Sequence, residues 1–287
     1  MTDSAAPGTR RPAPTVGLSP IPGKDRAARE IVASLRGDIA AGRLPRGARL
    51  PGERDLARHF GVSQPTVREA VRALDLMGLV DVRHGSGVYV TADVGAFLDT
   101  SLRTLMQVER VGIVEVLDLR TLLGGYSARR AAEHATEEEI ARMTALLDRS
   151  DAPPHGATVR EIATAPAAFQ IAVSAAAHDP LLLAIESVLV KVTVQLQLTA
   201  FDGRGRDFWL ERVSAFRTDR RRLLAFVTAH DGEGATTAMQ LYLRTQFAQF
   251  TADPALAALG VADPLAVASR LDVDLPPLGG PPRPAAG

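Results

Sequence analysis

Residues 50–90 carry the pattern that decides the fold of the first part of the chain: LPGERDLARHFGVSQPTVREAVRALDLMGLVDVRHGSGVYV. Apolar residues at helical spacing predict a short helix over Glu53–Phe60, and Gly61 ends it because glycine tolerates a positive φ. Ser63 is a good N-cap for a second helix, which stops at Gly78. Two helices joined by a tight turn are typical of a helix-turn-helix unit.

A hairpin follows the second helix. Valines alternate with other residues on both sides of a glycine-containing turn at positions 84–87, which predicts a two-stranded wing. An earlier helix, over about Arg26–Ala41, carries Ile31, Leu35 and further apolar residues on one face and completes the core. This order of elements predicts a winged helix-turn-helix, a unit that places one helix in the DNA major groove.

These residues resemble the GntR family of bacterial transcription regulators, over about 65 residues from Arg26 to Val90. The similarity implies a transcription regulator whose partner is double-stranded DNA. Many fixed positions occur in one order, so the pattern is specific. The matching elements are Leu50-Pro51-x-Glu53-Arg54-x-Leu56-Ala57, Gly61-Val62-Ser63, Thr66-Val67-Arg68-Glu69-Ala70, Leu74, Gly78-Leu79-Val80 and the wing tip Gly85-x-Gly87.

The resemblance also implies which side chains meet DNA. The family uses the positions of Arg54 and Arg68 to contact operator phosphate or guanine; ion pairing of these arginines with Asp55 or Glu69 is the alternative. Glutamine at position 64 matches N6 and N7 of adenine, whereas many relatives carry an arginine there, which reads guanine. The predicted DNA-contacting residues are Arg54, Ser63, Gln64, Pro65, Thr66, Arg68, His84 and Gly85.

Composition and charge narrow the class of protein. Residues 1–91 contain 14 Lys and Arg against 9 Asp and Glu, and because the whole chain is neutral, the remainder has a deficit of five. A basic N-terminal part followed by an acidic remainder is typical of a protein whose N-terminal part binds nucleic-acid phosphates. The chain has no cysteine, which excludes disulfides and thiolate chemistry. No apolar run reaches about 18 residues and no secretory leader begins the chain, which predicts a cytoplasmic protein.

From position 94 to about 252 the apolar residues repeat at helical spacing, and no strand pattern interrupts them. The predicted fold class is mainly α, with an N-terminal winged helix-turn-helix domain followed by an all-α helical bundle. We expect a disordered tail over 1–24, the DNA-binding domain over 25–92, a helical effector-binding and dimerisation domain over 93–252 and a Pro/Ala-rich tail over 253–287. The predicted helices of the bundle are Val94–Glu109, Gly112–Ala135, Glu137–Leu147, Val159–Ala177, Pro180–Leu198, Phe208–Ala229 and Gly232–Thr251.

This helical region resembles the ligand-sensing domain, of the FCD type, that FadR-type GntR regulators carry. The resemblance implies a homodimer that binds a palindromic operator and releases it when a small organic acid or acyl compound binds the bundle. The matching segments are Glu115-x-x-Asp118-x-Arg120, Ala131-Ala132-Glu133, Ala135-Thr136-x-Glu138, Phe169, Asp179-Pro180-Leu181-Leu182, Arg221 through Val227, and Ala238-Met239.

Many members of that family hold a divalent metal in the bundle through one Asp and three His, and this chain departs from the pattern. The four corresponding positions are Pro166, Gln170, Arg220 and Tyr242. Proline has no ligating side chain, and arginine stays protonated and repels a cation. We therefore predict no metal at this site, and no other cofactor.

The same positions predict a site for an anion. One interpretation is that Arg220 replaces the charge of the metal and binds an anionic effector directly, with Gln170 and Tyr242 as hydrogen-bonding partners. The other is drift in a pocket that is no longer used. Arg120 either points into the pocket as a second anion contact or pairs with an acidic neighbour at position 115 or 118, and we favour pairing. Phe208 and Trp209 either line the pocket or pack in the core, and we favour core packing for Trp209.

The predicted function is a dimeric, DNA-binding transcriptional repressor whose helical domain senses a small acidic metabolite. The alternative is an effector-independent regulator whose bundle serves only dimerisation. No Ser-His-Asp order, pair of catalytic carboxylates or metal cluster occurs in the sequence, so we do not expect an enzyme.

Overall fold

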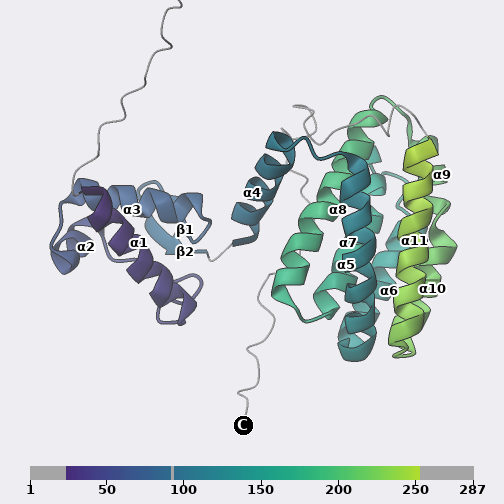
Figure 1. Ribbon diagram of the computed structural model, residues 1–287, viewed down its shortest axis with the longest axis horizontal. Helices are drawn as coiled ribbons and strands as arrows, with labels where there is room; N and C mark the ends of the chain where they lie inside the picture. Colours follow the sequence, from purple (N-terminus) through teal and green to yellow (C-terminus); the bar gives the residue numbers. More distant parts are fainter. Residues whose placement is uncertain (1–23, 92–93, 253–287) are drawn as a thin grey trace, which may run out of the picture. The chain divides into compact units, whose positions relative to one another are not determined.

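The chain folds into two units that divide between residues 92 and 93, and Figure 1 shows a small N-terminal unit and a larger helical one. The computed structural model describes residues 24–91 and 94–252. The two tails expected at the ends of the chain lie outside the described residues. Each unit is built around its own apolar core.

The N-terminal unit contains the predicted winged helix-turn-helix. Gly61 closes the second helix in the left-handed region, at φ 66°, and the Ser63 hydroxyl accepts the Thr66 amide as the N-cap of the third. The two strands pair antiparallel, with Val80 opposite Val90, and Arg49 forms an additional bridge with Tyr89. The elements are α1 Lys24–Ala40, α2 Glu53–Phe60, α3 Gln64–Leu76, β1 Val80–Arg83 and β2 Gly87–Val90.

The core of this unit lies between the three helices and the wing. Val67 and Leu74 on α3 have no exposed surface, and Ile31 and Leu35 on α1 are almost as deeply buried. These residues follow the helical spacing seen in the sequence, so each helix presents its apolar face to the others. The core therefore fixes which face of α3 remains available to solvent.

The second unit is an all-α bundle, as predicted. Figure 1 shows its long helices side by side, with α5 along α11 and α7 against α6 and α8. Side-chain oxygens of Thr136, Thr158 and Asp179 cap three of these helices. The helices are α4 Val94–Val108, α5 Ile113–His134, α6 Glu137–Asp151, α7 Val159–Ala176, α8 Pro180–Ala200, α9 Arg206–Ser214, α10 Arg217–Thr228 and α11 Gly232–Ala252.

Two glycines allow α5 and α11 to pack closely. A Cβ atom on Gly124 would lie 2.7 Å from Cδ1 of Leu243, and one on Gly125 would lie 2.9 Å from Nε2 of Gln240. Both distances are shorter than van der Waals contact, so a larger residue at either position forces the helices or their side chains apart.

The structure corrects two of the predicted helix boundaries. The single helix predicted over Phe208–Ala229 is two helices, α9 and α10, because the chain turns at Phe216. The Phe216 ring is buried and lies 5.8 Å from the ring of Tyr242, measured between centroids. Helix α6 also continues to Asp151, four residues beyond the predicted end at Leu147, because Arg217 and Arg221 of α10 hold the Asp151 carboxylate.

Helix α8 is, within the described residues, long and apolar enough to cross a membrane by length and composition alone. However, 67% of its most apolar window is buried inside the bundle. It also contains Glu186 and Lys191. These features are those of a core helix, which is apolar on all sides because other helices surround it.

Candidate functional site

The N-terminal turn of α3 forms one exposed surface of the winged helix. Ser63, Gln64 and Pro65 are exposed, so their side chains are accessible to a base edge. Thr66 is different, because only 4% of its surface is exposed and its hydroxyl lies 2.9 Å from the Ser63 hydroxyl. Thr66 therefore packs beneath the turn, and we remove it from the residues that we expect to contact bases.

Two predicted arginines lie beside this turn. Arg54 on α2 is exposed. Arg68 on α3 is also exposed, and its Nε donates to a carboxylate oxygen of Glu53 at 2.6 Å. The ion pair considered in the sequence analysis involved Asp55 or Glu69, but the acidic partner comes from the start of the preceding helix. Because more than half of the Arg68 side chain is accessible, the pair is a weak surface interaction.

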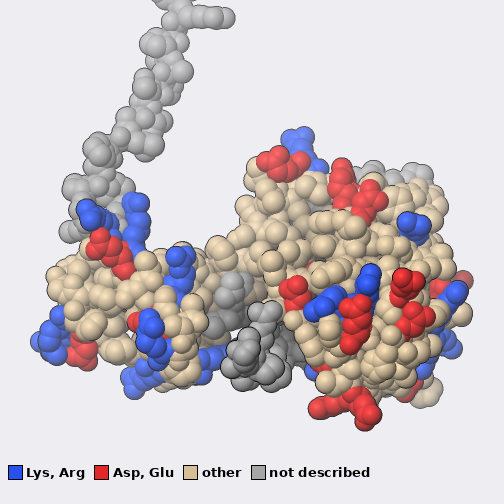
Figure 2. Space-filling view, turned by 60° about the horizontal axis from the view of Figure 1, so that its bottom comes forward, with Lys and Arg blue, Asp and Glu red and all other residues tan. Residues whose placement is uncertain are grey.

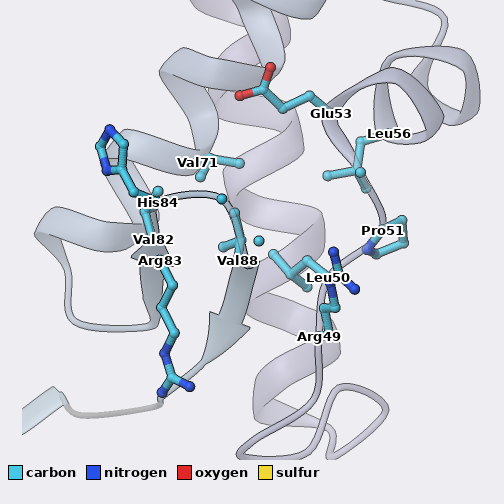
Figure 3. A pocket seen from close by; sticks show the side chains of 13 residues that line it. Arg49, Leu50, Pro51, Glu53, Leu56, Val71, Val82, Arg83, His84 and Val88 are labelled. Atoms are coloured by element: carbon cyan, nitrogen blue, oxygen red, sulfur yellow. The ribbon is translucent and has the colours of Figure 1, made fainter.

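The wing completes this surface. His84 and Gly85 are exposed at its tip, where Gly85 has a φ of 74°. A groove of about 550 Å³ runs between the wing and the start of α2. Figure 3 shows Val71 between His84 of the wing and Leu56 of α2, with Glu53 above them in this view.

Arg49 is a cation of this surface that the sequence analysis did not identify. It lines the same groove, and a Cβ on Gly87 would lie only 2.8 Å from its Nε. Gly87, at φ 117°, therefore lets the arginine lie against the wing. On the face shown in Figure 2, Lys and Arg outnumber Asp and Glu over the N-terminal unit, whereas both signs are mixed over the bundle.

The bundle contains a small cavity between α5, α7, α8, α9, α10 and α11. Its volume is about 40 Å³. A buried water needs roughly 10–15 Å³, so the cavity has room for about three heavy atoms. Among the described residues, its charged lining consists of Arg120, Arg212 and Arg220, and no Asp or Glu lines it. Such a lining favours an anion and disfavours a cation.

Three of the four predicted effector residues form part of one hydrogen-bonded chain. The Arg120 guanidinium donates to Gln170 Oε1 and, at 3.2 Å, to the Thr193 hydroxyl. Gln170 Nε2 then donates to the Tyr242 hydroxyl at 3.0 Å, and Gln246 Nε2 donates to the same hydroxyl at 3.0 Å. Arg120 and Gln170 line the cavity, while Tyr242 lies directly behind Gln170.

The pairing that we favoured for Arg120 is wrong. Its guanidinium points into the bundle, and no ion pair joins it to Glu115 or Asp118 in the described structure. Asp118, two positions away, lies on another face of α5, and both acids are exposed. Burial lowers the pKa of Arg120, partly opposed by the charge of Glu186. A buried cation without a direct carboxylate partner favours an anionic ligand.

Arg220, the fourth predicted effector residue, also lines the cavity and is 1% exposed. Its Nη2 donates to the Val213 carbonyl at 2.9 Å and lies 3.6 Å from Oδ1 of Asp151. Its Nε has no hydrogen-bond partner among the described residues. One side of the guanidinium is thus anchored by protein, and one donor remains to be satisfied.

Sequence reasoning missed a buried carboxylate near this chain. Glu186 on α8 is 5% exposed and accepts hydrogen bonds from the hydroxyls of Ser127, at 2.7 Å, and Ser174. Burial raises the pKa of Glu186, although the two hydroxyls and the charge of Arg120 oppose the shift. A lone acid within the apolar run of α8 is the signal that could have identified it.

We expect Glu186→Gln to become more stabilising, relative to wild type, as pH rises above the ordinary range of a glutamate carboxyl, because burial raises the pKa of Glu186. A carboxyl whose pKa is higher in the folded than in the unfolded state contributes stability at low pH, and this contribution is lost as pH rises through the folded pKa. Glutamine removes the titration and still accepts a hydroxyl. Thermal unfolding across this pH range measures the effect, with the exposed Glu138→Gln as control. A difference in melting temperature that stays constant or shrinks with pH would contradict the prediction.

The positions that hold a metal in related bundles do not fit a metal here. Pro166, Gln170 and Arg220 line a cavity that already contains the guanidinium groups of Arg120 and Arg212. In the part of the chain that the structure describes, no group of three or more Asp, Glu or His side chains is placed to hold an ion. The donor set is thus suited to an acceptor-bearing anion and repels a divalent cation.

Comparison with known protein families agrees with both units. Residues 27–90 match the family described as bacterial regulatory proteins, gntR family, and residues 115–245 match the FCD domain. The chain belongs to the GntR family. The two matches occur in the order in which the winged helix and the bundle occur, so this GntR regulator has a DNA-binding domain followed by an FCD domain.

Curated relatives of this GntR chain are transcription regulators. The Uxu operon transcriptional regulator of Escherichia coli is 28% identical over 76% of this chain and 84% of its own length. An uncharacterized HTH-type transcriptional regulator of Mycobacterium tuberculosis is 35% identical over 44% of this chain, and the match spans about half (53%) of that relative. The HTH-type transcriptional repressor NanR of Salmonella arizonae is 35% identical over 36% of this chain and 40% of its own.

A solved structure supports the fold. Streptococcus agalactiae GntR matches 76% of this chain and 98% of its own, with a TM-score of 0.58 and 20% sequence identity. The fold class predicted from sequence is therefore confirmed, as is the prediction that the chain is a DNA-binding regulator and not an enzyme.

Proposed function

We propose that this GntR regulator is a cytoplasmic, homodimeric repressor that binds a palindromic operator and responds to a small anionic metabolite bound in its FCD bundle. The observation that carries the effector part is the cavity lined by three arginines and no acid. The repressor part rests on the similarity to NanR, which is a transcriptional repressor.

On the DNA side, we propose that the exposed turn of α3 reads bases in the major groove while the wing tip approaches the backbone or minor groove. Gln64 is the proposed adenine reader. Arg54 and Arg68 contact phosphate or guanine. To do so, Arg68 breaks its surface ion pair with Glu53 and pairs with DNA instead. The proposed contacts are Arg54, Ser63, Gln64, Pro65, Arg68, His84 and Gly85.

In the bundle, we propose that Arg120 and Arg220 attract the anionic group of an organic acid or acyl compound, with Gln170 and Tyr242 orienting it. A cavity of about 40 Å³ holds a carboxylate but not a longer acid. A larger effector must therefore displace side chains or helices, which couples its binding to the conformation of the bundle. This coupling is the proposed route from effector to operator affinity.

The small volume also favours the second candidate, a regulator whose bundle serves only dimerisation. A pocket that side chains fill and that binds no ligand is expected to contain few buried polar groups without hydrogen-bond partners, because each such group lowers the stability of the fold. The unpaired Nε of Arg220 counts against that alternative. We therefore retain the effector-responsive regulator as the leading proposal.

For the dimer, we propose an interface along the exposed apolar residues of α5. Leu119, Leu122 and Tyr126 follow one another at three- and four-residue spacing, so they share a face, and they are 42%, 68% and 51% exposed. Exposed apolar residues in such a stripe are typical of an interaction surface. A single winged helix offers a small DNA interface, so specific binding needs two half-sites.

We expect Leu122→Asp to convert the dimer into a monomer, because it places a charge at the centre of the proposed interface. Light scattering at micromolar concentration measures the mass, and footprinting on an operator selected from random DNA measures the length of protected sequence. Leu181→Asp is the matched control, since Leu181 is also 68% exposed but lies in the first turn of α8, where an acid is tolerated. A monomeric wild type, or a Leu122→Asp variant that remains dimeric, would contradict the proposed interface.

A further inference from the structure

Two buried donors that have no acceptor in the described part of the chain belong to residues that line the same cavity. They are Nε1 of Trp209 on α9 and Nε of Arg220 on α10. Trp209 is 2% exposed and Arg220 is 1% exposed, so bulk water does not satisfy either group. Buried N–H groups are nearly always paired in native structures, and an unpaired one calls for a specific explanation.

Packing alone explains the ring of Trp209 but not its N–H group. The ring lies edge-on to Phe201 and Phe208, with centroid distances of 6.1 and 5.7 Å. A phenylalanine makes the same kind of edge-to-face contacts. What tryptophan adds beyond its larger ring is an indole N–H, which is a donor only.

The other polar groups of the cavity are already engaged with protein. Arg120 donates to Gln170 and Thr193, and Arg212 Nε donates to Gln197 Oε1 at 2.9 Å. Among the described residues no acceptor pairs with either N–H group, so both are open to an acceptor supplied by a ligand. The three arginines favour a negative acceptor, and the small volume favours a small one. A carboxylate group meets these conditions, because it is anionic, small and carries two acceptor oxygens.

We propose that Trp209 is a specificity-determining residue of the effector site, and that its indole N–H and the Nε–H of Arg220 together bind one carboxylate of the ligand. This inference rests on the proposed function and adds a residue and a chemical group to it. Trp209 donates to one oxygen and Arg220 to the other or to the same one. A neutral amide of the same shape is disfavoured, because it lacks the negative charge that the three arginines of the lining favour.

The experiment uses the single tryptophan of the full chain, which gives one indole N–H resonance after ¹⁵N labelling. The probe is acetate, with acetamide as its neutral counterpart and sodium chloride to match ionic strength. We expect a saturable shift of the indole resonance with acetate and none with acetamide. In parallel, calorimetric titration of Trp209→Phe, which keeps an aromatic ring, is expected to show at least a tenfold loss of acetate affinity.

The outcomes separate this inference from the proposed function. If wild type binds acetate but the indole resonance does not move and Trp209→Phe binds equally well, Trp209 is a packing residue and the anionic cavity stands without it. If acetate does not bind wild type, or acetamide binds as tightly, the inference and the carboxylate effector both fail. Tight binding of phosphate without acetate also overturns the inference. The resonance measurement decides the question even if the variant does not fold.

Discussion

Replacing Leu74 by alanine is expected to destabilise the winged-helix domain by about 2–5 kcal/mol. Leu74 lies on α3 with no exposed surface, in a core shared with α1 and the wing. The substitution removes three buried carbon atoms and leaves a cavity that the surrounding helices only partly fill. A domain of this size has a small core, so such a loss is a large part of its total stability.

Hydrogen exchange of the α3 amides measures this loss in the DNA-binding domain itself, and operator binding at 25 °C reports its consequence. The matched control is Leu76→Ala, because Leu76 lies two residues later on the same helix and is 80% exposed. The control makes the same chemical change and is expected to alter stability by less than about 0.5 kcal/mol. Equal effects of the two substitutions would show that Leu74 is not a core residue.

The second large effect concerns DNA. Arg68→Ala is expected to weaken operator binding by about 1–3 kcal/mol if Arg68 contacts a base. If it contacts a phosphate, the loss of affinity is the same for all DNA sequences. The slope of the logarithm of affinity against the logarithm of salt concentration then falls by about one, because about one counterion fewer is released. Its surface pair with Glu53 is weak, so the fold itself should change little.

Arg129→Ala is the matched control for Arg68→Ala. Both side chains are 56% exposed and both pair with a glutamate, but Arg129 lies on α5 in the bundle. Fluorescence anisotropy with a selected operator, at several salt concentrations, measures both variants. An Arg68→Ala dissociation constant equal to that of wild type at fixed salt would remove Arg68 from the DNA surface.

The elements that sequence reasoning located correctly are those fixed by local signals. Gly61, Ser63 and Gly78 mark the ends of α2 and α3, and the alternating valines mark the wing, because caps and periodicity act over a few residues. The start of α6 at Glu137 also agrees with the prediction, and there Thr136 and Glu139 form a capping box, which is likewise a local signal.

The features that it missed depend on contacts between distant residues. The break at Phe216 is set by packing against Tyr242, 26 positions later, and the direction of Arg120 by Gln170 and Thr193 on other helices. Helical periodicity does not show whether an arginine such as Arg120 points into the bundle, toward a polar partner, or outward, toward an acidic residue on the surface. Thr66 illustrates the same limit, since its place beneath the α3 turn depends on the three-dimensional core.

The cavity shows what residue identity alone can establish. Sequence comparison with the family pattern pointed to Gln170 and Arg220 as neighbours, and the structure places both at one cavity. It did not point to Arg212 or Gln246, and it favoured core packing for Trp209, whereas all three complete the lining from α9 and α11. Their part in the site follows only from the three-dimensional structure, which shows which buried donors lack a partner and which charged side chains share one cavity.

The central claim is that an anion in the FCD cavity controls operator affinity. The most direct test is to titrate the complex of the full chain and its selected operator with a panel of small carboxylic acids, each beside its neutral amide, and to measure the operator dissociation constant by anisotropy. The account predicts that at least one carboxylate changes this constant at least tenfold while its amide leaves it unchanged. An operator affinity that no carboxylate alters, or that an amide alters equally, would contradict it.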